Sequence, residues 1–82
     1  MAWLRGELFY VDLDEFTYAW IEFGSVCSLY IGDRIDVDRT IRIASDISYK
    51  LANELAIRLI NIRHDPNDLY TYDIDELIAE MS

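Results

Sequence analysis

Residues 16–31 read FTYAWIEFGSVCSLYI, in which two runs of aromatic and β-branched residues stand on either side of Gly24-Ser25. Such runs are typical of strands, and a glycine-containing pair between them is typical of a hairpin. We therefore expect one strand from Phe16 to Phe23 and another from about Val26 to Ile31. Paired through this turn, the two strands would form the centre of an antiparallel sheet.

The flanking residues extend this sheet in both directions. Apolar residues over residues 3–11 predict an earlier strand, and the acidic stretch at residues 12–15 favours a turn after it. On the other side, Gly32-Asp33 ends the third strand, and Ile35 with Val37 could form a short fourth one. The sequence thus predicts an antiparallel β-meander of three or four strands over about residues 3–37.

Beyond the sheet, apolar residues recur at a spacing of three or four, as on one face of a helix. The helix could begin with Asp38 or with Ser45 as its N-cap, and we favour Asp38. Strand-like alternation competes for the same residues, because apolar side chains at odd positions continue through Ile41 and Ile43. The long amphipathic helix would span about residues 38–63 or 46–63. Its core face would consist of Ile41, Ala44, Ile47, Leu51, Leu55, Leu59 and Ile62.

The stretch at residues 64–68 ends this helix, because Pro66 cannot continue it and disfavours helical geometry at the residue before it. A short second helix is expected over about residues 73–81, with Leu77 and Ile78 facing inward. The expected fold class is therefore α+β, with a meander, a long amphipathic helix and a short C-terminal helix in one domain, residues 1–82.

The composition restricts the class of protein. The chain has 82 residues, of which 52% are hydrophobic, and a single cysteine, Cys27, so it can fill one core but cannot form a disulfide scaffold. Its N-terminus has no basic region followed by an apolar one, and its longest uncharged run, residues 23–32, is far shorter than the roughly 20 residues that span a bilayer. We expect a soluble cytoplasmic domain without a membrane partner.

Charge is distributed unevenly along the chain, whose net charge is −9. Residues 7–33 and 64–82 each contain six acidic residues and no Lys or Arg, whereas residues 34–63 contain six basic and four acidic ones. Such a surface repels phosphates, so direct DNA or RNA binding is not expected. The acids either keep the domain soluble or imitate phosphates and attract a partner with a basic nucleic-acid-binding surface.

Three Asp-apolar-Asp triplets occur, at residues 12–14, 36–38 and 73–75. In an extended chain, each triplet would present two carboxylates on one side about 7 Å apart, near the spacing of phosphates along a nucleic-acid strand. The alternative is that these aspartates form turns and helix caps, where Asp is common.

The C-terminal stretch is our first choice for the partner-binding surface, because it combines carboxylates with flat aromatic groups that can stack on arginine. Its residues are Asp68, Tyr70, Tyr72, Asp73, Asp75, Glu76 and Glu80. The turn residues Asp12, Asp14 and Glu15 are the second choice, because a turn projects carboxylates clear of the sheet.

Two further features indicate contact surfaces. The strand at residues 16–23 carries large side chains on both faces, so a single helix layer leaves some aromatic residues facing elsewhere. On the long helix, Ile43, Ile57 and Ile60 lie opposite the core face and form a second apolar strip. This strip is either the contact of a homodimer or partner, or core covered by the C-terminal segment.

Catalytic and metal-binding patterns are weak. Cys27 and His64 stand far apart, and Cys27 lies in a predicted apolar strand, where a buried structural thiol is expected. Residues 65–76 partly match a calcium loop, but Leu69 occupies a ligand position and Tyr70 replaces the required glycine. The short chain also leaves little room for a ligand pocket. We expect no enzyme activity, no metal and no cofactor.

In size, acidity and its meander-plus-helix pattern, the chain is similar to the small inhibitors that bacteriophages and mobile elements encode against host defence enzymes, such as anti-CRISPR proteins. This resemblance of class implies an inhibitor that occupies the nucleic-acid site of a larger protein or complex. A structural or regulatory interaction domain, such as an immunity protein, an adaptor or a homodimeric subunit, is the alternative.

Overall fold

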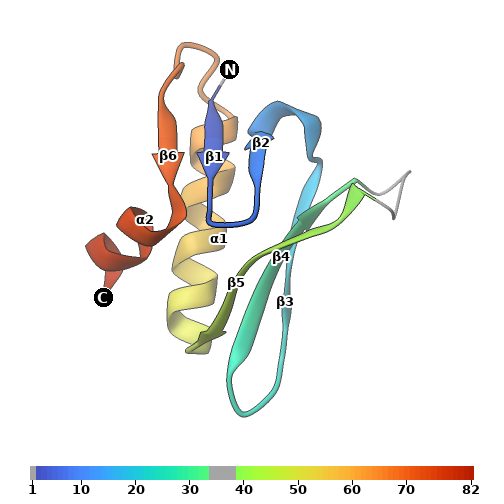
Figure 1. Cartoon of the computed structure of the whole chain (residues 1–82), viewed down its shortest axis with the longest axis vertical. Helices are drawn as coiled ribbons and strands as arrows, with labels where there is room; N and C mark the ends of the chain where they lie inside the picture. The colour runs from blue at the N-terminus through green and yellow to red at the C-terminus, as the bar shows by residue number, and fades with distance from the viewer. Residues whose placement is uncertain (1, 34–38) are drawn as a thin grey trace.

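The computed structural model describes residues 2–33 and 39–82. Strands precede a long helix and a short C-terminal helix, which confirms the predicted α+β class (Figure 1). The elements are β1 (Trp3–Arg5), β2 (Tyr10–Asp12), the 3-10 helix η1 (Leu13–Glu15), β3 (Tyr18–Glu22), β4 (Cys27–Gly32), β5 (Ile41–Ile47), α1 (Tyr49–Arg63), β6 (Thr71–Asp73) and α2 (Ile74–Met81).

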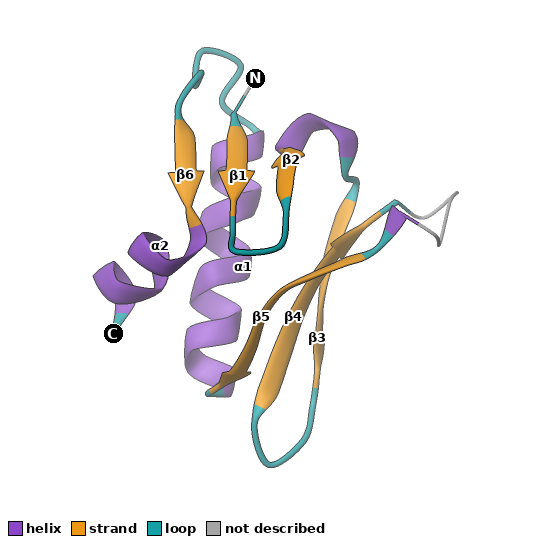
Figure 2. Cartoon of the chain, in the orientation of Figure 1, coloured by secondary structure: helices purple, strands orange, loops and turns teal. Residues whose placement is uncertain are grey.

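The strands of the described residues divide between two sheets. β3, β4 and β5 form an antiparallel meander, as the hairpin in residues 16–31 predicts. A second sheet has the order β2-β1-β6, with β2 antiparallel and β6 parallel to β1. η1 connects the two sheets and lies between β2 and β3 (Figure 2).

The predicted single strand at residues 3–11 is two strands with a turn between them. The Gly6 amide donates to the Phe9 carbonyl across this turn at 2.9 Å. The Phe9 ring lies directly against Gly6, and a Cβ at this position would overlap the ring. Glycine permits this close approach, and the chain reverses where alternation alone predicts continuation.

The favoured helix start at Asp38 is wrong, because Ile41–Ile47 form strand β5. Asp38 itself, like the proposed short strand at Ile35 and Val37, lies outside the described residues. The pairing of β5 with β4 has two register shifts, and the consecutive residues Ile43 and Ala44 are both buried. Because of these irregularities, the apolar residues of β5 do not alternate as in a regular strand. Their spacing in the sequence therefore resembles that of a helix.

α1 begins at Tyr49, close to the alternative start at Ser45 or Asp46. Ser48 is its N-cap, and the Ser48 hydroxyl accepts a hydrogen bond from the Leu51 amide at 3.2 Å. One face of α1 enters the core, and the helix contacts β3, β4, β5, η1 and α2. The buried residues of α1 are Ala52, Leu55, Leu59 and Ile62.

α2 closes the core from the C-terminal side. Leu77 is buried and Ile78 packs against the core cluster, as the sequence predicts. Ile74 is also buried and fixes the start of the helix next to β6. None of the helices within residues 2–33 and 39–82 is long and apolar enough to cross a membrane.

Candidate protein-binding surface

The C-terminal acidic stretch lies on β6 and α2. β6 is an edge strand, and α2 follows it directly. Asp75, Glu76 and Glu80 are exposed on α2, and Tyr70, which precedes β6, is 62% exposed. The surface therefore combines carboxylates with an accessible aromatic side chain.

Asp68 and Tyr72 bind each other within this stretch. The Tyr72 hydroxyl donates to one carboxylate oxygen of Asp68 at 2.5 Å, and the Tyr70 amide donates to the other at 2.9 Å. The hydrogen bond with Tyr72 lowers the pKa of Asp68, and the same bond raises the pKa of Tyr72 to about 12. The Tyr70 and Tyr72 rings meet edge to face at 4.9 Å. This local network orders the segment that leads into β6.

Asp73 caps α2 and pairs with an arginine from the other end of the chain. Its carboxylate accepts from the Asp75 amide at 2.9 Å, and its other oxygen lies 3.1 Å from the Arg5 guanidinium. Desolvation opposes ionisation of Asp73, but hydrogen bonds from the Asp75 amide and Arg5 lower its pKa overall. The sequence provides no signal for this pair, because 68 positions separate the two residues.

In the described part of the chain, the carboxylates of Asp75, Glu76 and Glu80 have neither a hydrogen bond nor an ion pair. These exposed side chains are therefore accessible to a partner from solvent. Asp68 and Asp73, in contrast, are engaged within the fold. The C-terminal acidic stretch, which the sequence analysis treats as one cluster, thus contains two kinds of acidic residue. Some have hydrogen bonds or ion pairs within the fold, and the others have none.

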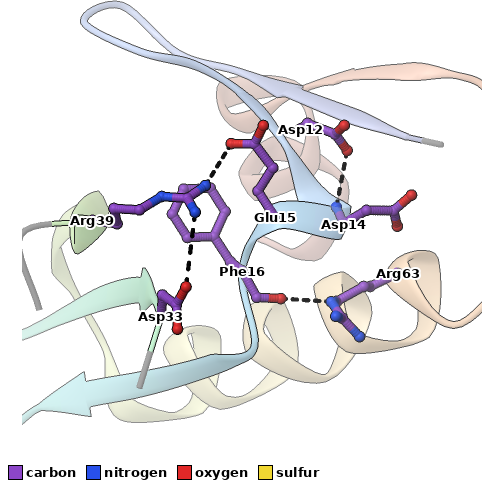
Figure 3. A network of polar contacts seen from close by, with 7 residues as sticks. All are labelled: Asp12, Asp14, Glu15, Phe16, Asp33, Arg39 and Arg63. Atoms are coloured by element: carbon purple, nitrogen blue, oxygen red, sulfur yellow. Dashed lines mark hydrogen bonds and ion pairs between the residues drawn. The ribbon is translucent and has the colours of Figure 1, made fainter. Parts of the chain in front are cut away.

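The second-choice residues lie at η1, with Asp12 as its N-cap and Asp14 and Glu15 within it. Two arginines hold this connection between the sheets (Figure 3). Asp12 is buried, and its carboxylate accepts from the Asp14 amide at 2.9 Å as the N-cap of η1. Glu15 pairs with Arg39 at 2.7 Å. Asp14 is exposed and is the carboxylate of this turn without a partner among the residues that the structure describes.

Arg39 and Arg63 fix the loop after η1. The Arg39 guanidinium lies 5.8 Å from the centre of the Phe16 ring and 3.8 Å from the Asp33 carboxylate (Figure 3). Arg63, in the last turn of α1, donates from Nε to the Phe16 carbonyl at 2.6 Å. Most of the charged side chains around η1 therefore have partners within the fold and help to hold β2 and β3 in place.

The Asp-apolar-Asp triplets at residues 12–14 and 73–75 are turns and caps. In each one, the carboxylate of the first aspartate accepts a hydrogen bond from the backbone amide of the second. The two carboxylates therefore do not project side by side. The apolar residues between them, Leu13 and Ile74, are buried. The triplet at residues 36–38 lies outside the described residues.

The predicted apolar strip is shorter than expected. Ile43 does not belong to α1, because it lies on β5 and is buried in the core at 4% exposure. Ile57 and Ile60 lie on α1 and are 50% and 45% exposed. A two-residue apolar patch on the helix remains as the candidate dimer contact.

Aromatic residues of the meander face away from the core, as the large side chains on both faces of the predicted strand indicate. Ala19 and Ile21 of β3 pack against the core cluster. Tyr18 and Trp20 lie on the opposite face of β3, and the Trp20 ring contacts Tyr30 of β4. The outer face of this sheet thus carries three neighbouring rings.

Residues with chemical reactivity are dispersed. Cys27 is buried, as predicted for a structural thiol, whereas His64 is the exposed C-cap of α1. An apolar hollow of about 280 Å³ lies between β3 and the end of α1, and Arg63 and His64 are among the residues that line it. Over residues 2–33 and 39–82, no three potential metal ligands gather in one place.

No family model matches the chain, and no solved structure matches it. Among curated proteins, it is similar to the macrolide export ATP-binding/permease protein MacB 1 of Yersinia pestis bv. Antiqua (strain Antiqua) and to MacB 1 of Yersinia pseudotuberculosis serotype I (strain IP32953). Each is 30% identical over 59 residues, which are 72% of this chain and 9% of the transporter. Because the match spans so small a share of these relatives, it concerns one segment of them and does not place the chain in their family.

Proposed function

We propose that this chain is a non-enzymatic binding protein whose acidic surface occupies the basic nucleic-acid-binding site of a larger protein or complex. The observation that carries the proposal is the exposed face of α2, where Asp75, Glu76 and Glu80 have no internal partner among the described residues. Glu76 and Glu80 are one helical turn apart, so their charges act together. Tyr70, which is 62% exposed, adds an aromatic group before β6.

The mechanism would be steric and electrostatic competition. A net charge of −9 attracts a cationic groove over a distance of about a Debye length and accelerates encounter at low salt. Once docked, the domain would cover the Lys and Arg side chains that contact phosphates. A host-defence nuclease complex is the kind of partner that the resemblance of class suggests.

Displacement by nucleic acid tests this proposal. The protein is immobilised, and partners are captured from a nuclease-treated lysate of cells that encode it, then challenged with duplex DNA or structured RNA at constant ionic strength. A partner that shares its binding site with nucleic acid is released. Retention of the captured protein at saturating nucleic acid would show that a different surface of the partner is bound, and the proposal would be abandoned.

Two variants with equal charge locate the contact on α2. Glu76→Gln with Glu80→Gln removes two exposed charges from α2, whereas Asp46→Asn with Glu54→Gln removes two exposed charges elsewhere. The first variant should capture the partner much more weakly than the wild type does. The second should capture it only slightly more weakly, because only its net charge is less negative. Equal losses would mean that the overall charge, and not the surface of α2, drives association.

A structural or regulatory interaction domain is the second proposal. It is favoured by Ile57 and Ile60, which expose about half of their surface side by side on α1. A self-complementary contact through this patch would form a homodimer with two-fold symmetry. Sedimentation of the free protein distinguishes the proposals, because competition for a basic site does not require a dimer.

A further inference from the structure

We propose that the outer face of the β3-β4-β5 sheet is a stacking platform for arginine side chains of a basic protein partner. This inference rests on the proposed function, because it supplies the side chains that would recognise the partner's cations. The platform consists of Tyr18, Trp20 and Tyr30.

The three rings form one continuous surface. Trp20 on β3 is paired directly with Tyr30 on β4, and their ring centres are 5.1 Å apart with planes inclined by 39°. Tyr18, two residues before Trp20 on the same face of β3, lies 5.7 Å from the Trp20 ring at 31°. The rings are therefore tilted neighbours on one side of the sheet, while α1 contacts the same strands from the side of the core.

Gly32 allows Tyr18 to lie across β4. Gly32 is paired with Tyr18, and a Cβ at this position would be 3.1 Å from the Tyr18 hydroxyl oxygen and 2.8 Å from the Thr40 hydroxyl. A larger residue at position 32 would force both side chains to move. The absence of a side chain at Gly32 thus leaves room for the Tyr18 ring at this end of the platform.

The exposure of these neighbouring aromatic rings indicates that they contact another molecule. Trp20 is 41% exposed, and Tyr18 and Tyr30 are partly exposed beside it. Contiguous aromatic surface on a small acidic domain marks a contact site, because tyrosine and tryptophan bury a large area with little loss of rotamer freedom.

Charge identifies the class of occupant. Two copies of a chain with net charge −9 would repel each other face to face, and nucleic acid would be repelled as well. A cationic protein segment is attracted, and Glu22 lies on the same face of β3, two residues after Trp20. Arg42 lies on β5, where it is paired with Tyr30 of β4, and it places a positive charge at the other edge of the platform. An incoming guanidinium should therefore stack on Trp20 near Glu22.

Arginine fits this surface better than lysine does. The guanidinium group is planar and weakly hydrated, so it stacks on aromatic faces, whereas the lysine ammonium is a compact and strongly hydrated charge. Oligoarginine and oligolysine peptides of equal length carry the same charge, so they separate stacking from general electrostatic attraction. The difference between the affinities of the two peptides therefore measures the contribution of stacking on the platform.

The test is a titration of the folded full chain with each peptide at about 0.1 M salt, where the Debye length is about 10 Å. Calorimetry gives both affinities, and a Trp3→Phe background leaves Trp20 as the only tryptophan for fluorescence. Oligoarginine should bind at least about fivefold more tightly than oligolysine, which corresponds to one or two stacked guanidinium groups, and should change Trp20 emission. Trp20→Leu should remove this preference, and Trp20→Phe should retain part of it.

Phe23→Leu is the matched control, because Phe23 is 71% exposed but stacks on Tyr49 and lies outside the platform. Circular dichroism verifies that each variant is folded. Equal affinity for the two peptides, or an unchanged preference in Trp20→Leu, would overturn the platform while leaving binding through α2 intact. Failure to bind either peptide would instead count against the proposed function, so the two failures are distinguishable.

Discussion

Replacing Tyr72 by Phe tests the local network that orders the acidic surface. The hydroxyl of Tyr72 donates to Asp68 at 2.5 Å, and its ring packs against the core cluster. Phe keeps the ring and removes only the hydrogen bond, so the loss of stability measures this bond with little loss of packing.

The expected magnitude follows from the partial burial of the pair. A hydrogen bond to a charged group contributes about 1.5–3 kcal/mol when it is well shielded, and a neutral one about 0.5–1.5 kcal/mol. The bond is only partly buried, so we expect about 1 kcal/mol. For a domain of this size, 1 kcal/mol corresponds to a decrease of about 4–8 °C in Tm.

The pH dependence of this difference has a definite sign. The pKa of Asp68 is lowered below 3.8, so its contribution is present above that unfolded value and is lost as the pH falls through the folded pKa. The pKa of Tyr72 is raised from 10.0 to about 12, so its contribution is present below pH 10.0 and is lost as the pH rises toward about 12. Between about pH 5 and 9 the two proteins should differ by a constant amount.

Thermal unfolding by circular dichroism at about pH 7 and about pH 3 measures the effect. The wild type should unfold at the higher temperature at neutral pH, and the gap should shrink in acid as Asp68 becomes protonated. An equal Tm for both proteins at neutral pH would mean that the bond contributes no net stability. A gap that persists unchanged in acid would show that the hydroxyl acts through a different partner.

Three further outcomes are expected. Asp46, an exposed residue of β5, has φ 57°, so Asp46→Gly should raise the free energy of unfolding by about 0.5–1 kcal/mol and Asp46→Val should lower it, as measured by denaturant titration. The double variant Ile57→Glu with Ile60→Glu should keep the helical circular dichroism signal of the wild type, and a wild type that sediments as a monomer at high concentration would discard the homodimer alternative. Association with the captured partner should slow substantially between about 0.05 and 0.5 M salt in stopped-flow measurements, and an on-rate independent of salt would exclude electrostatic steering.

Local patterns predict those elements whose partners are nearby in the chain. The hairpin in residues 16–31 is built from adjacent strands, so alternation and the intervening turn determine it, with ends displaced by only a few residues. The helix at Tyr49–Arg63 follows from apolar spacing that no irregularity disturbs. In β5, by contrast, the register shifts bury Ile43 and Ala44 together, and the resulting spacing favours a helix over the strand that forms.

Elements that depend on distant partners could not be predicted in this way. β6 has three residues and exists through its parallel pairing with β1, at the other end of the chain. The pairs Arg5–Asp73 and Arg39–Glu15 likewise join residues 68 and 24 positions apart. Counting charge along segments therefore overstates the free negative charge, because it cannot identify which carboxylates already have a cation.

Aspartates perform two different tasks in this fold, and the division determines where binding energy can come from. Asp12, Asp65, Asp68 and Asp73 each accept a hydrogen bond from the amide two residues later, which forms a turn or begins a helix. A partner that engaged these carboxylates would have to break local structure. The free charges of α2 carry no such cost, and they supply attraction without much discrimination among cations. Selectivity between cationic partners must therefore come from groups that distinguish arginine from lysine. The adjacent rings of Tyr18, Trp20 and Tyr30 can meet this requirement, because aromatic faces favour a planar guanidinium over an ammonium group.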